Sequence, residues 1–255
     1  MRLAVVAGGW HWPLHFFQEM PKALPGADLF VIAHRSPELA IVREEKREIL
    51  ATATGPLADL DRELYAGYPT IDDLRGMLWD YQEAPNTVGD WGFFNQWLES
   101  HDYRDYDVIL NCHDDTYIRR HDLADQLAGD WLLLANGRYP EAPVGYVRGS
   151  FEFWKRELLD LLGGRIDLGD VGLTRDGQTD TPAGLDALSA WNNTAVPLRD
   201  FMVKRGLQDR IAYLSPHYRV SPYAIECERG FLHLQGGAPW SFEKGLQEFP
   251  LEVAV

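Results

Sequence analysis

The sequence predicts an α/β fold in which helices flank a mainly parallel central sheet. Short apolar runs at 3–7, 28–33 and 107–112 each end in glycine or polar residues, which is typical of buried parallel strands. Roughly 20 residues separate the first two runs, which is enough for the helical crossover of a βαβ unit. An apolar content of 45% over 255 residues allows a sizeable core, and we expect one domain spanning 1–255.

The first βαβ unit begins with the run at 3–7, which Gly8 and Gly9 stop. A helix is predicted to start at 14–20, and the run at 28–33 forms the second strand. The two glycines lack the Gly-x-Gly-x-x-Gly spacing of dinucleotide-binding folds. A Rossmann dinucleotide site is therefore not predicted here.

The next segments connect this unit to the third apolar run. Residues 37–64 are charged and helical in character, with oppositely charged residues at helical spacing, and we assign them no chemistry. Residues 68–81 predict a connecting loop with a short helix. Residues 86–98 predict a helix that Asn86 can cap.

Two adjacent carboxylates, Asp114 and Asp115, follow the apolar run at 107–112. Open α/β sheets bind their ligands at the C-terminal ends of strands, which is where this pair is predicted to lie. Burying two like charges side by side is costly, and a divalent cation is a common way to offset that cost. The structural alternative is a solvated turn at the end of a strand.

The C-terminal half alternates further strands and helices with loops. A strand is predicted at 131–135, and an amphipathic helix at 151–162 that Gly163 and Gly164 end. The stretch at 167–183 is rich in Gly, Asp and Thr and predicts a long loop, which in compact domains is typical of a functional lid or a disordered segment. The remaining elements are a helix within 191–206 and strands at 211–216 and 230–234.

The net charge and the composition disfavour some classes of binding partner. A formal net charge of −15 disfavours nucleic acids and anionic membrane surfaces as partners. The first apolar run is too short for a signal peptide or a membrane anchor, so no stable membrane insertion is expected. Cys112 and Cys227 imply no disulfide framework, and Cys112 is expected to be a buried free thiol. Together these features predict a cytoplasmic protein.

Residues 113–118 (HDDTYI) follow the apolar run and resemble the Asp-rich motif of GT-A-fold glycosyltransferases, in its Fringe-like Asp-Asp-Asp-Thr-Tyr form. The resemblance implies a single GT-A-like domain that moves a sugar from a nucleotide-diphospho-sugar donor to an acceptor. It also implies a Mn²⁺ or Mg²⁺ ion held by Asp115 with help from Asp114. This sequence departs from the family pattern in one place, since His113 replaces the first aspartate of the triplet.

The resemblance extends to other positions as a layout. A late histidine often completes the metal shell in these enzymes, and His233 takes that place here; the alternative is a histidine packed in the core. Arg35 is likewise either a contact to base or phosphate or a surface charge at a strand end. The nucleotide-binding residues that the resemblance implies are Ala7, Gly8, Arg35, Asn86, Asp114 and Arg148.

The catalytic base is where the sequence departs further from the family. The late helix resembles the segment in which an acidic pair supplies the general base of inverting members, but this sequence has Asn192 and Asn193 there. An amide does not take a proton at neutral pH, so Asp186, six residues earlier, is the nearest replacement base. If no carboxylate acts as the base, the alternative is an enzyme that retains the configuration of the anomeric carbon, with an amide on the reacting face of the sugar.

Two other functions remain open from the sequence. A metal-dependent phosphohydrolase or nucleotidyltransferase could use the same carboxylates, although such enzymes usually want more metal ligands early in the chain, where His11 and His15 are isolated. A non-catalytic sugar-binding protein derived from a transferase is the third possibility, which Asn192 and Asn193 keep open.

Overall fold

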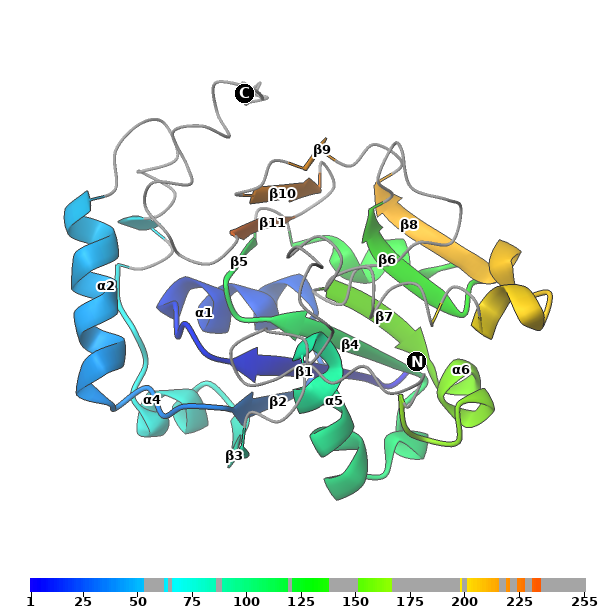
Figure 1. Ribbon diagram of the computed structural model, residues 1–255, viewed down its shortest axis with the longest axis horizontal. Coiled ribbons are helices and arrows are strands. Elements are labelled where there is room, and N and C mark those ends of the chain that lie inside the picture. The colour runs from blue at the N-terminus through cyan, green and yellow to red at the C-terminus, as the bar shows by residue number, and fades with distance from the viewer. Residues whose placement is uncertain are drawn as a thin grey trace, which may run out of the picture.

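The computed structural model of the chain describes residues 1–52, 62–63, 66–85, 89–118, 121–137, 151–166, 198, 201–215, 219–220, 224–227 and 231–234 (Figure 1). Its main sheet has seven strands in the order β3-β2-β1-β4-β7-β6-β8. The strands are β1 (Leu3–Gly9), β2 (Asp28–Ala33), β3 (Trp79–Glu83), β4 (Val108–His113), β6 (Leu133–Gly137), β7 (Phe151–Lys155) and β8 (Ile211–Ser215). Within this sheet β7 runs against its neighbours, while the other strands are parallel. The predicted α/β fold with a mainly parallel sheet is confirmed.

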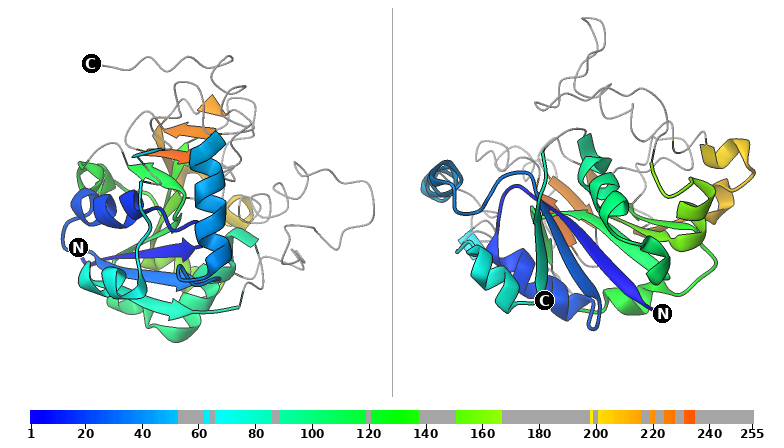
Figure 2. Two further views of the ribbon diagram at one scale, coloured as in Figure 1. Left: turned by 90° about the vertical axis from the view of Figure 1, so that its left-hand side faces the viewer. Right: turned by 90° about the horizontal axis from the view of Figure 1, so that it is seen from below.

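Helices flank the sheet on both faces. In Figure 2, α1 (blue) and α5 (green) lie on opposite sides of the strands. The helices include α1 (Leu14–Ala23), α2 (Ala40–Thr52), α4 (Ile71–Gly76), α5 (Gly89–Ser100) and α6 (Arg156–Leu161), with short 3₁₀ helices at Tyr103–Asp105, Leu123–Leu127 and Gln208–Arg210. Residues 201–204, within the helix predicted at 191–206, are helical as well. Within the described residues, none of the helices is long and apolar enough to span a membrane.

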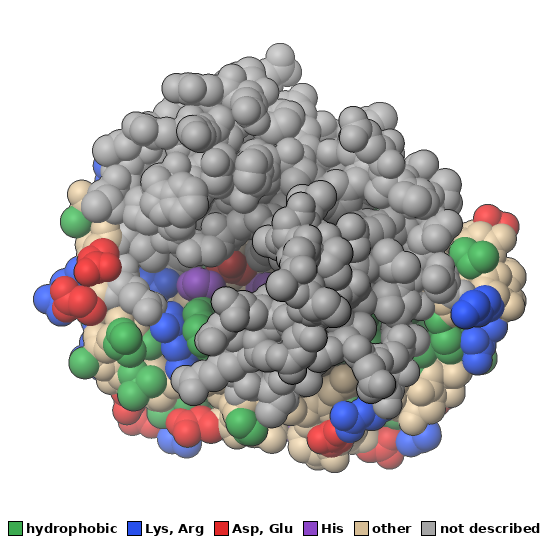
Figure 3. Space-filling model, viewed as in Figure 1, with side chains coloured by type: hydrophobic (Ala, Val, Ile, Leu, Met, Phe, Trp, Pro, Cys, Tyr) green, Lys and Arg blue, Asp and Glu red, His purple; other side chains and the backbone are tan. Residues whose placement is uncertain are grey.

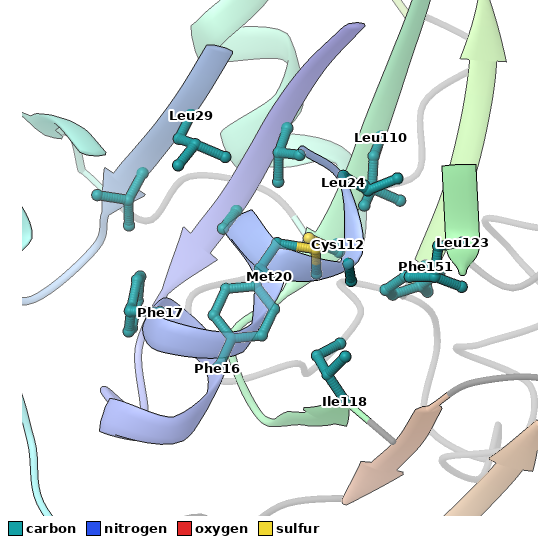
Figure 4. Packing of buried hydrophobic residues seen from close by; sticks show 14 of the residues in the cluster. Phe16, Phe17, Met20, Leu24, Leu29, Leu110, Cys112, Ile118, Leu123 and Phe151 are labelled. Atoms are coloured by element: carbon teal, nitrogen blue, oxygen red, sulfur yellow. The ribbon is translucent and has the colours of Figure 1, made fainter. Parts of the chain in front are cut away.

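The core on the α1 face is shown in Figure 4. Phe16 and Met20 of α1 pack over Leu110 and Cys112 of β4, and all four side chains are fully buried. Cys112 is a buried free thiol, as expected, and burial raises its pKa well above the ordinary value. Alternate residues of each strand contribute to this face, which is the periodicity that fixes the register of a sheet.

The opposite face packs against α5 and α6. Phe94 of α5 lies against Trp154 of β7, with ring centroids 5.7 Å apart, and Trp91 meets the same indole edge-on at 6.0 Å. Ile109 of β4 is buried beneath them. The two faces therefore hold separate apolar clusters, and both fix β4 at the centre of the fold.

Two predictions were wrong in part. The stretch at 68–81 holds the predicted short helix, α4, but it also holds the start of the third parallel strand β3, which was predicted as loop and pairs with β2. The segment 151–162, predicted as one helix, is divided into strand β7 and helix α6. In β7 the side chains alternate, since Phe151 and Phe153 join the α1-side cluster while Trp154 joins the other.

A second, antiparallel sheet begins where the main sheet ends. It has the order β5-β11-β10-β9, with β5 (Thr116–Ile118), β9 (Arg219–Val220), β10 (Ala224–Cys227) and β11 (Phe231–Leu234). The strand predicted at 230–234 is confirmed, but it belongs to this second sheet. Because β5 starts directly after Asp115, the acidic pair lies between the two sheets.

The strand order reverses at β1. Its partners are β2 on one side and β4 on the other, and the register places Gly8 beside His113. In open α/β sheets such a reversal leaves a crevice outside the C-terminal ends of the two strands, where ligands bind. The loop after β1 and the acidic pair after β4 meet at this point.

Candidate functional site

Asp114 and Asp115 come directly after β4, as predicted, and are buried: only 1% and 4% of their surfaces are exposed. The alternative of a solvated turn is therefore wrong. Burial removes the water that would otherwise separate and screen the two carboxylates, so their charges act strongly on each other and on nearby groups.

Asp114 holds the loop that follows β1. Its Oδ2 atom accepts hydrogen bonds from the backbone N–H groups of Trp10 at 2.9 Å, His11 at 2.8 Å and Trp12 at 2.7 Å. Three successive N–H groups thus converge on one carboxylate oxygen, as in an anion-binding nest. Trp12 has a left-handed backbone with φ of +58°, which is strained for a residue with a bulky side chain. The bonds to Asp114 are one reason why this conformation persists.

Electrostatics at Asp114 act in two directions. Burial raises the pKa of Asp114 to about 6, and the charge of Asp115 adds to the rise. The N–H groups of Trp12 and Trp10 and the positive charge of Lys46 favour the ionised carboxylate and so lower its pKa. Because two carboxylates are buried side by side here, added positive charge is stabilising at this place.

His11 lies beside the acidic pair, a position that sequence reasoning missed. Its Nε2 atom is 3.8 Å from Oδ2 of Asp115. Burial lowers the pKa of His11 to about 3, although the charge of Asp115 acts in the opposite direction. The imidazole is thus neutral at neutral pH, which is the form that binds metals. The missed signal is that His11 follows the first strand by two residues, at the sheet edge where Asp115 also lies.

Positive charge enters the site from two other elements. Arg35, just after β2, donates from Nε to the carbonyl of Trp10 at 2.7 Å and lies over the Trp10 ring at 4.5 Å. Lys46 comes from α2 and is only 2% exposed. The positive charges of both side chains lower the pKa of His11. Figure 3 shows histidine and acidic side chains together in a hollow, with Lys and Arg side chains beside them.

A pocket of about 290 Å³ opens at the C-terminal ends of β2 and β3. Its lining residues are Ala33, His34, Arg35, Ser36, Glu83, Ala84 and Pro85. Gln96 of α5 ties two of these together: its amide donates to the Pro85 carbonyl at 2.6 Å, and its Oε1 lies 3.0 Å from Nε2 of His34. Because that Oε1 can only accept, the Nε2 atom of His34 carries the proton. Arg35 links this pocket to the acidic pair.

Gly8 and Gly9 give the crevice its close packing. A Cβ atom on Gly8 would lie 2.9 Å from the ring of Phe93, and one on Gly9 would lie 2.5 Å from the indole of Trp12. The Trp12 indole is fully buried, and its Nε1 donates to the carbonyl of Arg35 at 2.9 Å. Because the last two residues of β1 are glycines, the ring of Phe93 packs directly on Gly8 and the indole of Trp12 packs directly on Gly9.

Gly9→Ala is expected to destabilise the protein by about 1–3 kcal/mol, because the buried indole of Trp12 has no room to move away from the added methyl group. Thermal unfolding measures the change. Gly76→Ala is the matched control, since nothing lies within 4 Å of the added atom and alanine favours the helix that Gly76 ends. Equal melting temperatures for Gly9→Ala and the wild type would contradict the packing described.

The other predicted site residues divide into two groups. Ala7 is fully buried in the α1-side cluster, so its side chain does not face the crevice, while the Gly8 carbonyl accepts from the Asp114 N–H at 3.3 Å. His233 lies in β11, where its backbone is paired with Thr116, the residue after Asp115. The predicted residues outside the described part of the chain are Asn86, Arg148, Asp186, Asn192 and Asn193, whose roles remain predictions.

The residues present fit a Mg²⁺ or Mn²⁺ ion that a ligand helps to hold. Within the described ranges, no three His, Cys, Asp or Glu side chains converge as a ready-made cage. Mg²⁺, however, is usually held by one or two carboxylates together with water and substrate phosphates. The Oδ1 atom of Asp114 is buried and has no hydrogen-bond partner among the described residues, and Asp115 and the neutral His11 lie beside it.

Comparisons with known proteins yield distant likenesses only. No family model matches the chain, and no curated protein matches it. The glycosyltransferase GlyE of Streptococcus pneumoniae TIGR4 is similar at 15% identity with a TM-score of 0.40, over 84% of this chain and 45% of GlyE. Residues 1–349 of S. aureus TarS are similar at 12% identity with a TM-score of 0.43, over 97% of this chain and 64% of that one.

A third structure, the galactosyltransferase LgtC in complex with donor and acceptor sugar analogues, is similar at 9% identity with a TM-score of 0.36, over 84% of this chain and 73% of LgtC. The chain thus spans about half the length of GlyE and somewhat less than two thirds of the TarS fragment. At these TM-scores the likenesses assign no role to any residue.

Proposed function

We propose that this protein is a metal-dependent glycosyltransferase that moves a sugar from a nucleotide-diphospho-sugar donor to an acceptor. The observation that carries the proposal is the buried pair Asp114 and Asp115, located after β4 at the reversal of the strand order. Residues 113–118 resemble the Asp-rich motif of GT-A-fold enzymes, and this resemblance implies that the pair holds a cation for a nucleotide-sugar donor.

The donor would lie across the C-terminal ends of β1 to β4. Its nucleoside would occupy the pocket beside His34 and Glu83, and its diphosphate would extend past Arg35 toward the acidic pair. A diphosphate approaching a protein of net charge −15 needs local positive charge. Arg35 supplies part of that charge and is already oriented by the Trp10 carbonyl and ring.

Asp115, the Oδ1 atom of Asp114 and His11 would hold the cation, with His233 as a further predicted ligand. When bound, a divalent cation acts as a Lewis acid that stabilises the charge developing on the leaving diphosphate. The chain's own contribution is to keep these groups in place. Asp114 does so through its three bonds to the loop at residues 10–12, and burial keeps His11 neutral and able to bind.

The transferred sugar passes through an oxocarbenium-like state as the bond between its anomeric carbon and the diphosphate oxygen breaks. The acceptor hydroxyl attacks that carbon and loses its proton to a base. Asp186 is the proposed base of an inverting reaction. In a retaining reaction, Asn192 or Asn193 would instead place an amide oxygen on the reacting face.

The position of bond cleavage tests the proposal against a phosphohydrolase. A transferase acting slowly on water breaks the carbon–oxygen bond and releases a nucleoside diphosphate. A phosphohydrolase breaks a phosphorus–oxygen bond and releases a nucleoside monophosphate. In ¹⁸O-labelled water the label enters the sugar in the first case and the phosphate in the second. Binding of sugar nucleotides without any cleavage, with all acceptors tried, would favour a non-catalytic sugar-binding protein.

Removal of divalent cations is expected to weaken nucleoside diphosphate binding by at least about tenfold, because the acidic pair then repels the phosphates. Calorimetry with UDP, GDP, CDP and dTDP, in Mn²⁺ and in EDTA, measures the difference. The corresponding nucleosides serve as the control, since they carry no phosphate and should bind equally in both buffers. Equal diphosphate affinity in Mn²⁺ and in EDTA would contradict the metal dependence.

A further inference from the structure

Lys46 is a buried cation on helix α2. Glu44, Arg47 and Glu48 on α2 are exposed, whereas Lys46 is 2% exposed. Lysine is rarely buried unless a charged group holds it. Val42, one helical turn earlier on the same face, is fully buried in the core. The face of α2 that carries Lys46 is therefore turned into the protein.

That face meets the crevice. Helix α2 stands outside the C-terminal ends of β1 and β2 (Figures 1 and 2). Lys46 and Val42, one turn apart on this helix, are both buried and therefore face inward. Arg35 follows the end of β2, and its guanidinium is held against Trp10 in the loop after β1. Two cations from separate elements therefore accompany the two carboxylates.

The formal charges of the site balance when a divalent cation and a diphosphate are both bound. Asp114 and Asp115 contribute two negative charges, and Lys46 and Arg35 contribute two positive ones. A divalent cation would bring two more positive charges, and the diphosphate of a sugar nucleotide brings about two negative charges. The loaded site is then neutral, which a buried site requires. Without Lys46 it would carry an uncompensated negative charge.

We propose that Lys46 binds the diphosphate of the donor, forming with Arg35 the positively charged side of a site whose other side is the acidic pair. This inference rests on the proposed function, because it takes the ligand to be a nucleoside diphosphate. An ammonium donates three hydrogen bonds and acts as a point charge toward phosphate oxygens. Helix α2, to which the sequence assigned no chemistry, is thereby part of the donor site.

Lys46→Met tests the inference, since methionine keeps the apolar stem and removes the charge. Arg47→Met is the matched control on the same helix, because Arg47 is exposed and pairs with Glu44. Calorimetry in Mn²⁺ compares the tightest-binding of UDP, GDP, CDP and dTDP, the nucleoside of the same base, and Mn²⁺ alone. We expect Lys46→Met to weaken diphosphate binding about ten- to a hundredfold, as loss of a charged hydrogen bond does. Affinity for the nucleoside should be unchanged, and affinity for Mn²⁺ unchanged or higher.

Rescue separates a binding role from a structural one. Lys46→Arg retains a positive charge and should bind the diphosphate within about threefold of the wild type, a difference of about 0.7 kcal/mol. If Lys46→Met does not fold, Lys46→Gln takes its place in the comparison. Equal diphosphate binding by wild type and the neutral variant would overturn the role of Lys46 alone, as would an equal loss of nucleoside binding. A wild-type protein that binds no nucleoside diphosphate would overturn the proposed function as well.

Discussion

Asp115→Asn is expected to remove metal-dependent nucleotide binding and to lower sugar transfer by about two to three orders of magnitude, by analogy with the loss of one group that stabilises an oxyanion. Asparagine has nearly the size of aspartate but lacks the anionic oxygen that hard divalent cations prefer. Asp115 is 4% exposed, so water does not readily replace the lost ligand. Calorimetry with a nucleoside diphosphate in Mn²⁺ and the rate of donor cleavage measure the two effects.

Asp80→Asn is the matched control for this substitution. Asp80 lies exposed on β3, so the same chemical change there should leave both binding and turnover unaffected. Equal nucleotide binding by the wild type and Asp115→Asn in Mn²⁺ would contradict the metal role of Asp115.

Asp114→Ala is expected to cause a large loss of stability. The N–H groups of Trp10, His11 and Trp12 would lose their common acceptor, at about 1–3 kcal/mol for each donor left without a partner. Relief of the repulsion between Asp114 and Asp115 offsets part of this cost. We expect a net loss of about 2–4 kcal/mol, which lowers the melting temperature by roughly 10 °C in a protein of this size.

Asp114→Asn separates the hydrogen bonds from the charge. The amide keeps a carbonyl oxygen that can accept the three N–H bonds, so its loss of stability should be well below that of Asp114→Ala. Differential scanning calorimetry of both variants shows which of them loses more stability. If Asp114→Ala melts at the wild-type temperature, the loop after β1 is held by other contacts.

The fold was largely predictable because buried parallel strands have continuous apolar sequences. The strands β1, β2 and β4 are of this kind, and their predicted boundaries differ from the structure by no more than two residues at either end. The edge strand β3 lacks that signal, since Trp79 is buried but Asp80 is exposed. In β7 the run of large apolar residues continues into α6, and a short run of this type fits a helix as well as a strand.

The site was predictable only where it is local in sequence. Asp114 and Asp115 stand together in the chain and could be recognised as a pair. His11 reaches them because the sheet places Gly8 beside His113, a pairing across roughly 100 residues that no local pattern encodes. Lys46 is buried, although the charged sequence around it predicts an exposed surface.

The bonds from Asp114 to the loop after β1 also bear on when the site can form during folding. Asp114 and its three N–H donors are separated by 102 to 104 residues, so the contact is strongly non-local. A nascent chain that ends before β4 has the loop but not its acceptor, and Trp12 then has no bond from Asp114 to favour its left-handed conformation. The crevice therefore takes shape only when β4 docks against β1, and chains that have not yet paired these two strands have no donor site to offer.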